Sequence, residues 1–521
     1  MSEATPAERA STSLCALLAV LTVGGLYLWR RGTGFVVQDE GYLWYGVQGV
    51  LRGELPLRDF NSYDPAPYVW CAGFARLFGD DLDTLRLAAR AFAALGVVAG
   101  LRVLGRATRS VALLAVGALA LALWIEPHWK SFGPALSLIA VWAGMRLFER
   151  DDRAAHVAAG AVAGLAACFG RNYGLYAALG LGLVVLVAGL RRAPRELPRR
   201  LAIYSGGVLL GYAPMLLAVA FVPGFARAFV ESIGYFASQG HLEGKRAIPF
   251  PWRLDPEGWD TPAVLHNHGV GWTYVALPLL VLAGLVLVAR TPRERLAERA
   301  APLAAACVGL FWVHHALVHA AYYHLAQAVH PLLLLAGTLG LAAPPPRRRV
   351  AVGLGVGALA LSAGVTVVPG LEVLHLARVQ DTPAAMVEFE VEDDEVWLRP
   401  EQAWYLTTLV ETLERRVPAD EPLFLAPTFP GLYCLLGRRA PTWDVYLAWR
   451  ATPTSQARLV EELAHVRWAM VTNAAPMGQE WLRLSNTNPE AWAVLLRDFE
   501  RVDEPGELPR GHRLLRRRDA H

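Results

Sequence analysis

Long apolar blocks separated by short polar stretches dominate the first 370 residues of the chain. Most are close to the length of about 17 to 25 residues that a helix needs to cross a bilayer. A soluble chain of this size would instead spread its apolar residues with the period of one helix or strand face. The pattern predicts an α-helical polytopic membrane protein. Its predicted spans are residues 12–29, 86–105, 110–125, 134–149, 155–170, 173–190, 201–222, 271–290, 300–319, 324–342 and 350–368.

Arginines between these blocks predict the orientation. They gather in five loops, all of which lie on the cytoplasmic side if the N-terminus is cytoplasmic, as the positive-inside rule requires. The segments left outside are a first loop at 30–85, a turn near Glu126, a second long loop at 223–270 and the tail from about 371. The five basic loops contain Arg106 and Arg109; Arg146, Arg150 and Arg153; Arg191, Arg192, Arg195, Arg199 and Arg200; Arg290, Arg293, Arg295 and Arg299; and Arg347, Arg348 and Arg349.

The tail differs in character from the rest of the chain. Short apolar runs at Leu423–Ala426 and Trp468–Val471 alternate with helical patterns at Ala457–His465 and Glu490–Phe499. This alternation is typical of a small α/β domain. We therefore expect a transmembrane, catalytic region at 1–370 and an extracytoplasmic α/β domain at 371–521.

Composition narrows the class of protein further. The chain has 521 residues, is 54% hydrophobic and 18% charged, and has a mean hydropathy of +0.32. A net charge of +3 is too small to indicate a nucleic-acid partner. The five cysteines show no metal-ligand spacing and no disulfide framework. Since no small-residue cleavage site follows the first block, we expect that block to be a retained anchor in the cytoplasmic (inner) membrane.

Carboxylates and aromatic residues gather in the first outer loop, directly after the first span. Adjacent carboxylates where a helix leaves the bilayer are costly to desolvate, which favours a functional role. An ordinary solvated loop at a helix end is the alternative. The residues concerned are Asp39, Glu40, Tyr42, Tyr45, Asp59 and Asp64, of which Tyr42 and Tyr45 are spaced for one helix face.

The Asp39-Glu40 pair is followed by Gly-Glu-Leu-Pro-Leu-Arg-Asp at 53–59 and by Leu-Phe-Gly at 77–79, before the second span. In this order the segments resemble the GT-C glycosyltransferases, in particular the protein mannosyltransferase and lipid A aminoarabinose transferase group. The resemblance covers roughly residues 12–370. It implies that Asp39 acts as catalytic base or orients the acceptor, with Glu40 as its neighbour. It also implies an enzyme of the hexosyl-, pentosyl- or mannosyltransferase kind (EC 2.4 class), a polyprenyl-phosphate-linked sugar donor, and a cell-envelope glycan, lipid or protein as acceptor.

Such a reaction needs a carboxylate to accept the proton of the attacking hydroxyl, and fixed cations or donors for the departing lipid phosphate. By topology, the candidate phosphate ligands share the outer face with Asp39; they are Arg171, Lys130, His128, Lys245 and Arg246. Snorkelling of Arg171 to the interface, and plain solvation of the two loop cations, are the alternatives. Glu126 is either a helix-end residue or the second acidic group that the resemblance implies.

A histidine-rich segment ends the ninth predicted span. His315 and His319 are four residues apart and lie on one helical face, a spacing that suits metal ligands. The glutamate of the H-E-x-x-H motif is missing, however. Lining of a polar cavity, a bound divalent metal and simple packing all stay open for this segment, which contains His315, His319, Tyr322, Tyr323 and His324.

Two other classes of protein remain as alternatives. A transporter or flippase of lipid-linked saccharides would suit the many spans, but the chain shows neither paired halves nor interrupted helices in matching positions. An outer-face glycan polymerase or ligase would favour a large outer loop late in the membrane region. The chain also has no P-loop, Rossmann glycine fingerprint or G-x-S-x-G elbow. These observations favour a transferase that uses a lipid-linked donor.

Overall fold

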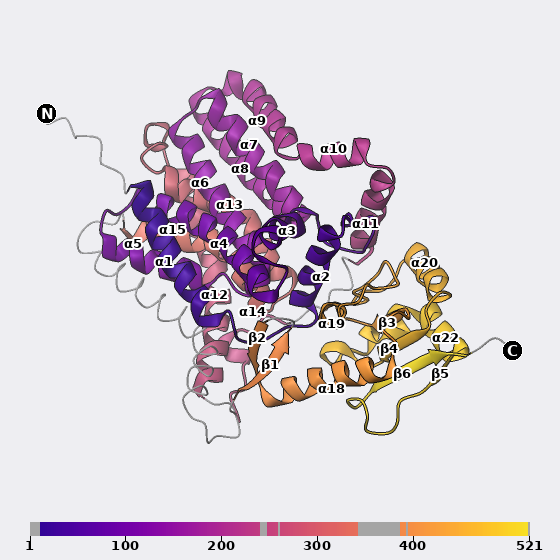
Figure 1. Ribbon diagram of the computed structural model, residues 1–521. Helices are drawn as coiled ribbons and strands as arrows, with labels where there is room; N and C mark the ends of the chain where they lie inside the picture. Colours follow the sequence, from indigo (N-terminus) through magenta and orange to yellow (C-terminus); the bar gives the residue numbers. More distant parts are fainter. Residues whose placement is uncertain (1–10, 240–246, 259–260, 342–385, 392–393, 519–521) are drawn as a thin grey trace, which may run out of the picture. The chain divides into compact units, whose positions relative to one another are not determined.

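The computed structural model describes residues 11–239, 247–258, 261–341, 386–391 and 394–518 (Figure 1). The chain forms two compact units. We call residues 1–31, 86–217 and 244–374 the helical unit, and residues 32–85, 218–243 and 375–521 the sheet unit. The domain boundary expected near residue 370 lies outside the described residues. The first outer loop and the C-terminal domain thus belong to the same compact unit.

The helical unit contains the predicted spans. Ten of them coincide with a helix or with two consecutive helices, and the eleventh, 350–368, lies outside the described residues. The helices of the unit are α1 (Thr12–Arg30), α4 (Leu82–Leu104), α5 (Val111–Leu123), α6 (Phe132–Glu149), α7 (Arg153–Phe169), α8 (Arg171–Arg192), α9 (Leu197–Gly211), α10 (Ala213–Phe221), α12 (Thr261–Arg290), α13 (Ala300–Val318), α14 (Tyr322–Ala328) and α15 (His330–Leu341).

These helices differ in whether they are long and apolar enough to cross a membrane. Among the described residues, five helices are long and apolar enough to cross a membrane, and seven if each bent pair counts as one span. The helices α5 and α7 are apolar but only 13 and 17 residues long. The predicted spans at 110–125 and 155–170 are therefore real helices that fall short of the usual membrane-crossing length.

Prolines account for the two bent pairs. The helices α9 and α10 meet at 59°, and α14 and α15 at 54°. Pro214 and Pro331 stand in the first turns of α10 and α15. Because proline lacks an N–H and its ring clashes with the preceding turn, each of them ends the helix before it. The continuous apolar stretches at 201–222 and 324–342 thus become two helices each.

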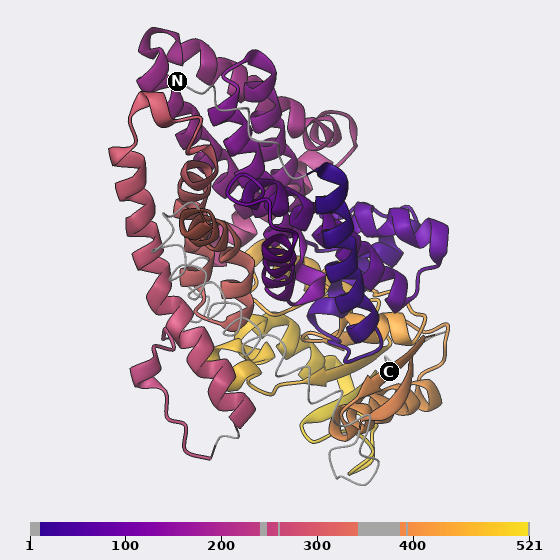
Figure 2. The same cartoon turned by 90° about the vertical axis from the view of Figure 1, so that its left-hand side faces the viewer.

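Leucines on α1 and α12 lie on the surface. Only 22% of the apolar window of either helix is buried, and α12 runs as one long helix (Figure 2). Such apolar surfaces are unfavourable in water and favourable against lipid acyl chains. The chain is a multi-pass membrane protein. The exposed leucines are Leu17, Leu21 and Leu28 on α1, and Leu279, Leu282 and Leu285 on α12.

Glycines bring α7 and α9 into backbone contact. A Cβ atom added at Gly160 would lie 2.1 Å from the carbonyl oxygen of Tyr204, and one added at Gly164 would lie 2.1 Å from that of Val208. Gly207 and Gly211 provide the matching gaps on α9. Small residues four apart allow membrane helices to approach closely. This packing places α7, α8 and α9 side by side (Figure 1).

Four of the five basic loops are joined to one another inside the helical unit. Glu149 pairs with Arg106 of the first loop and, at 3.0 Å, with Arg146 of the second. Asp151 of the second loop pairs at 2.7 Å with Arg200 of the third. Arg191 of the third loop donates to the carbonyl of Thr291, next to the fourth. These four loops therefore do lie at one end of the helices, and the fifth, with Arg347, Arg348 and Arg349, lies outside the described residues.

The sheet unit combines short helices with two small sheets. Its helices are α2 (Asp39–Leu51), α3 (Ala66–Phe78), α11 (Phe225–Gln239), α18 (Pro400–Arg416), α19 (Pro430–Leu435), α20 (Pro453–Leu463), α21 (Leu484–Thr487) and α22 (Pro489–Asp498). Its strands are β1 (Val387–Val391), β2 (Asp394–Leu398), β3 (Leu423–Ala426), β4 (Trp468–Thr472), β5 (Phe499–Arg501) and β6 (His512–Arg517). β1 and β2 form an antiparallel hairpin, and the other strands form a sheet in the order β3-β4-β6-β5.

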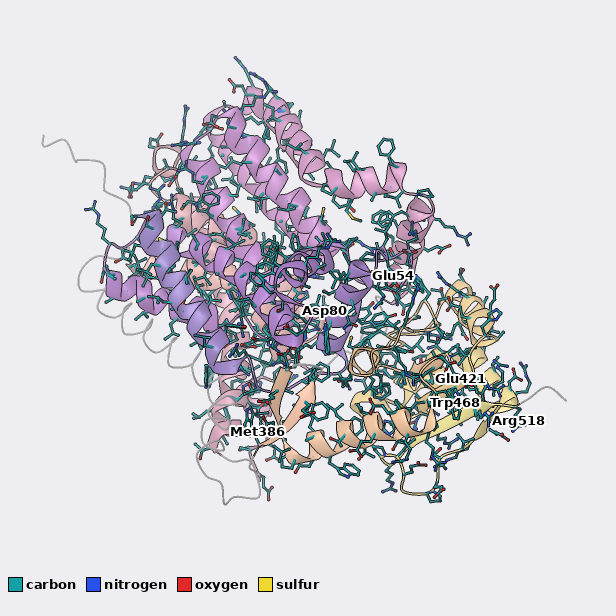
Figure 3. The ribbon with its side chains drawn as sticks, viewed as in Figure 1. Glu54, Asp80, Met386, Glu421, Trp468 and Arg518 are labelled. Carbon is teal, nitrogen blue, oxygen red and sulfur yellow. The ribbon has the colours of Figure 1, made fainter. Side chains whose placement is uncertain are left out.

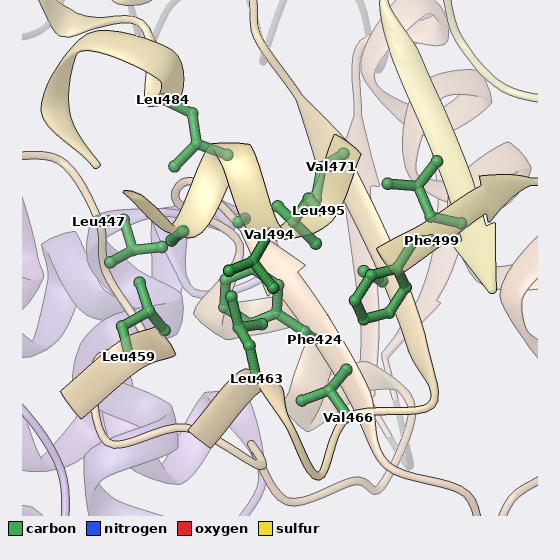
Figure 4. Packing of buried hydrophobic residues seen from close by; sticks show 14 residues of the cluster. Phe424, Leu447, Leu459, Leu463, Val466, Val471, Leu484, Val494, Leu495 and Phe499 are labelled. Carbon is green, nitrogen blue, oxygen red and sulfur yellow. The ribbon is translucent and has the colours of Figure 1, made fainter. Parts of the chain in front are cut away.

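The four-stranded sheet carries the core of the C-terminal domain. Strands β3 and β4 run parallel, and every residue of both is buried. Phe424 and Val471 pack against Leu463 of α20 and Leu495 of α22 (Figure 4). At the start of β4, the Trp468 indole donates to the Glu421 carboxylate, as the labelled side chains show (Figure 3). The predicted fold class, a polytopic helical protein with a small C-terminal α/β domain, is confirmed.

Candidate active site

Asp39 begins helix α2 in the sheet unit. Carboxylates are favoured in the first turn of a helix, where the backbone N–H groups point outward and the dipole is positive. The side chain stays partly exposed, and its Oδ1 accepts a hydrogen bond of 3.0 Å from the Tyr446 hydroxyl. A half-exposed carboxylate held on a helix end and by a hydroxyl donor is suited to meet a substrate group.

Glu40 has a different environment from its neighbour. It is fully buried, and its Oε2 accepts a hydrogen bond of 3.2 Å from the backbone N–H of Val36. This bond closes the turn that precedes α2. The structure thus separates the Asp-Glu pair into an accessible carboxylate and a buried one that holds the turn.

Aromatic rings surround Asp39. Tyr42 lies one turn further along α2, and its ring centroid is 4.9 Å from that of Tyr446 and 5.4 Å from that of Tyr63. Burial raises the pKa of both the Tyr42 and the Tyr446 hydroxyl, and the nearby Asp39 charge raises the latter further. Tyr446 therefore remains protonated and donates. Tyr63 is 41% exposed, so that one ring of this tyrosine cluster meets solvent.

Asp444 fixes the loop that carries Tyr446. This buried carboxylate accepts hydrogen bonds from the Asn61 amide at 2.9 Å and from the backbone N–H of Tyr446 at 3.1 Å. Burial raises its pKa. The indole of Trp443 donates to the carbonyl of Leu57 at 3.1 Å, and the Trp443 carbonyl accepts from the Asn61 N–H at 2.7 Å. The C-terminal domain is thereby bonded to the first outer loop at two residues just before the tyrosine, Trp443 and Asp444.

Two glycines allow this docking. A Cβ added at Gly41 of α2 would lie 2.5 Å from the Cα and N of Gly431 in α19. The Gly431 N–H in turn donates to the Val37 carbonyl at 2.9 Å. The backbones of α2 and α19 touch because neither residue has a side chain.

The remaining carboxylates of the loop, Asp59 and Asp64, are placed differently. Asp59 accepts from Nε and Nη2 of the Arg58 guanidinium, each at 2.8 Å, and from the Leu55 N–H at 2.7 Å. The hydrogen bond from Arg58 lowers the pKa of Asp59. Asp64 is buried, and its charge acts on the phenol of Tyr68. Asp59 thus holds the shape of the loop, while Asp64 lies among the aromatic residues.

Glu126 lies in the helical unit between two arginines. Its Oε1 is 2.5 Å from Arg90 and 3.1 Å from Arg30. Burial alone would raise its pKa, but the charges of Arg90, Arg30 and His128 outweigh that effect and lower it to about 2. Glu126 therefore carries a permanent negative charge. Its electrostatic neighbours also include the phenol of Tyr322.

The histidine-rich segment forms a second cluster in the helical unit. The ring of His315 stacks on that of His324 at 4.9 Å, and His319 lies 4.8 Å from His324. The charge of Lys130 acts on both His315 and His324, which places this lysine beside the cluster. Three imidazoles and one ammonium group thus come from α13, α14 and the turn before α6.

Aromatic and amide groups border the histidines. The Tyr176 hydroxyl lies 2.9 Å from Nδ1 of His314, and the Asn172 amide 3.5 Å from Nδ1 of His315. Tyr322 packs on Tyr323 at 5.3 Å and on His266 at 5.0 Å. Arg171 begins α8, directly before Asn172. Lys245 and Arg246 lie outside the described residues.

Within the described parts of the chain, no group of three or more His, Cys, Asp or Glu is arranged to hold a metal ion. His324 lies beside both His315 and His319, but the three imidazoles are not arranged as metal ligands.

Several residues of these clusters escaped sequence reasoning. The partners of Glu126, Arg30 and Arg90, stand 96 and 36 residues away from it, inside or at the end of apolar blocks. Tyr446 and Asp444 belong to a segment, Thr-Trp-Asp-Val-Tyr, whose mixture of aromatic and acidic residues is the one available signal. Only the fold reveals that this segment meets Asp39.

The chain is similar to solved structures of a membrane glycosyltransferase. Two of these are structures of ArnT from Cupriavidus metallidurans, a lipid A aminoarabinose transferase. The structure bound to undecaprenyl phosphate aligns with 15% sequence identity and a TM-score of 0.47, and the apo structure with 14% identity and a TM-score of 0.49. Either similarity covers 97% of this chain and 98% of ArnT. An oligosaccharyltransferase from Archaeoglobus fulgidus, solved with Zn and sulfate, is 12% identical with a TM-score of 0.45, over 96% of this chain and 74% of that one.

The chain matches no protein-family model and no curated protein. A fold hosts many activities, so we argue the function from the side chains of this chain.

Proposed function

We propose that this protein is a glycosyltransferase that moves a sugar from a polyprenyl-phosphate donor to an acceptor hydroxyl, with Asp39 as the catalytic base. The observation that carries the proposal is the partly exposed Asp39 carboxylate, held by the Tyr446 hydroxyl beside the exposed ring of Tyr63. Aromatic rings next to a carboxylate suit a sugar or another polyhydroxylated acceptor, because the ring covers an apolar face while the carboxylate accepts a hydroxyl proton.

The chemical step is a substitution at the anomeric carbon of the donor sugar. The acceptor oxygen forms a bond to that carbon, and the bond from the carbon to the phosphate oxygen breaks. The lipid phosphate leaves with the electron pair, and the hydroxyl proton passes to the Asp39 carboxylate. General-base catalysis of this kind contributes about 10²- to 10⁴-fold to the rate.

The departing phosphate needs positive charge and hydrogen-bond donors. In the helical unit, Lys130 and the imidazoles of His315, His319 and His324 form such a group. A neutral imidazole donates from one nitrogen, and an ammonium group donates three hydrogen bonds and a full charge. We assign this cluster, with Arg171, to the donor phosphate.

The proposed location is the outer face of the cytoplasmic membrane, with the N-terminus and the basic loops inside and the C-terminal domain outside. The joined basic loops support it, because arginine-rich loops are retained in the cytoplasm. A lipid-linked donor suits this location, since nucleotide-linked donors are cytoplasmic.

A transfer assay tests the proposal. Purified protein is incubated with a panel of radiolabelled undecaprenyl-phosphate sugars, with extracted cell-envelope material as acceptor. Label should move to the acceptor with the native protein and fall to background with Asp39→Asn. Glu231→Gln removes an exposed carboxylate of α11 that pairs only with Arg227 among the described contacts, and it should keep full activity.

Transfer by Asp39→Asn at the native rate would remove Asp39 as the base. No transfer from any donor of the panel, with folded protein, would overturn the transferase assignment. Movement of intact labelled lipid across proteoliposome membranes would then establish the flippase alternative.

A further inference from the structure

The loop between α19 and α20 brings a residue of the C-terminal domain to the proposed base. Tyr446 lies 407 positions after Asp39 in the chain, and its hydroxyl donates to Oδ1 of Asp39 at 3.0 Å. The first outer loop, α2 and this loop all belong to the sheet unit. The C-terminal domain is thus in direct contact with the carboxylate assigned to the chemistry.

We propose that Tyr446 is the positioning residue of Asp39, so that the C-terminal domain completes the catalytic site rather than serving only as an accessory domain. This inference rests on the proposed function of Asp39 as base. A base must stand within hydrogen-bond reach of the proton that it takes, and small displacements of it are costly in rate.

The position of Tyr446 is determined independently of Asp39. On one side, Asp444 accepts from the Tyr446 backbone N–H and from the Asn61 amide. On the other side, the Leu447 N–H donates to the Pro427 carbonyl at 2.8 Å. Bonds on both sides of the tyrosine fix its backbone, so its hydroxyl is a fixed donor to which the carboxylate adjusts.

The ring of Tyr446 is fixed as well. It packs on Tyr42, whose own ring meets Tyr63 edge to face. Tilted and edge-to-face ring contacts of this kind restrict ring rotation. The phenol can therefore hold one carboxylate oxygen in place while the carboxylate serves the acceptor.

The test compares Tyr446→Phe with a matched variant of the same domain. Tyr446→Phe removes the hydroxyl and keeps the ring against Tyr42. Tyr405→Phe removes another half-buried hydroxyl, which lies 2.9 Å from Nε2 of His512. In the transfer assay we expect Tyr446→Phe to lower kcat by about tenfold with an unchanged KM for the acceptor. Tyr405→Phe should leave both constants at their native values.

A second measurement does not require activity. Asp39→Ala, Tyr446→Phe and the double variant are unfolded in detergent as a double-mutant cycle, because alanine removes the acceptor and phenylalanine the donor. A direct hydrogen bond predicts that these two substitutions are not additive in stability, whereas Asp39→Ala and Tyr405→Phe should be additive.

The outcomes separate this inference from the proposed function. An inactive Asp39→Asn together with native kcat in Tyr446→Phe would overturn the inference and leave the proposed function in place. A rise in KM without a fall in kcat would assign Tyr446 to acceptor binding and also overturn it. Full activity of Asp39→Asn would overturn both the inference on Tyr446 and the proposed role of Asp39, whatever the activity of Tyr446→Phe. Additivity of Asp39→Ala and Tyr446→Phe in stability would contradict the contact itself.

Discussion

The guanidinium of Arg90 lies 2.5 Å from the carboxylate of Glu126, and both groups are withdrawn from solvent. The exposed fraction of the side chain is 5% for Arg90 and 11% for Glu126, whereas that of Arg30, the other partner, is 32%. Arg90 also donates to the Ile125 carbonyl at 2.9 Å. The arginine thus ties α4 to the loop that follows α5.

Removal of Arg90 should destabilise the helical unit strongly. Arg90→Ala leaves a buried carboxylate without its nearest cation, which costs about 3–5 kcal/mol. Arg30→Ala removes a more exposed partner and should cost at most about 1 kcal/mol. Unfolding in detergent followed by tryptophan fluorescence measures both. Equal losses for the two variants would contradict the dominant role of Arg90.

The same ion pair predicts a loss of stability in acid. The folded pKa of Glu126 is lowered to about 2 from an ordinary value of 4.5. Because the pKa of Glu126 is lower in the folded state, its carboxylate contributes fully to stability above the pKa of the unfolded state. That contribution is lost as the pH falls toward 2. The unfolding midpoint should therefore decline between about pH 4.5 and 2. Glu126→Gln, although less stable at neutral pH, should show a flatter profile over that window; a profile as steep as the native one would assign the acid sensitivity to other carboxylates.

Local patterns account for the part of the fold that the sequence could predict. The apolar run Leu423–Ala426 is strand β3 with the same bounds, because a short, fully apolar run fits a strand buried on both faces. The helices α2 and α3 inside the first outer loop were not predicted. Their apolar residues are interrupted by turns and prolines. The helices are stabilised by packing, α2 on α19 and α3 on α2, and not by a continuous pattern.

Long-range contacts account for what could not be predicted about the site. Asp39 was predicted from its carboxylate neighbour and its place after a span, both of which are local. Its partner Tyr446 is determined by the docking of the C-terminal domain on the loop around Asn61. Nothing in the spacing of either segment indicates that contact. The side-chain roles of Asp39 and Glu40 also diverge only once burial is known.

Backbone contact between α7 and α9 should make one glycine intolerant of a single methyl group. In Gly164→Ala the new Cβ would lie 2.1 Å from the Val208 carbonyl, so the helices must separate. We expect a loss of about 1–3 kcal/mol in stability. Gly206→Ala on α9 is the matched control, because nothing lies within 4 Å of its Cβ and alanine favours the helix. A neutral Gly164→Ala would show that the two helices are less closely packed.

The proposed orientation predicts which surface cysteines react from outside. The native cysteines are all buried. Cysteines placed at exposed Glu257 in the second outer loop and at exposed Arg510 in the C-terminal domain should react with a membrane-impermeant maleimide in intact spheroplasts. A cysteine at Glu196, in the third basic loop, should react only after permeabilisation. The reverse pattern would place the basic loops outside and invert the topology.

The cluster around Lys130 should bind the lipid phosphate. Undecaprenyl phosphate, added in detergent micelles, should raise the unfolding temperature of the native protein, because a ligand that binds the folded state stabilises it. Lys130→Ala removes a charged donor beside His315 and His324 and should weaken binding by about tenfold or more. Arg171→Ala should weaken binding similarly if Arg171 contacts the phosphate, and native affinity would show that Arg171 only reaches the membrane interface.

The exposed Arg109, in the first basic loop, provides the control, since Arg109→Ala removes a cation from the opposite end of the helical unit. Weakening by Arg109→Ala to the same degree as by Lys130→Ala would identify the effect as general attraction of an anionic lipid to a basic protein, and the phosphate site would then have to be sought elsewhere.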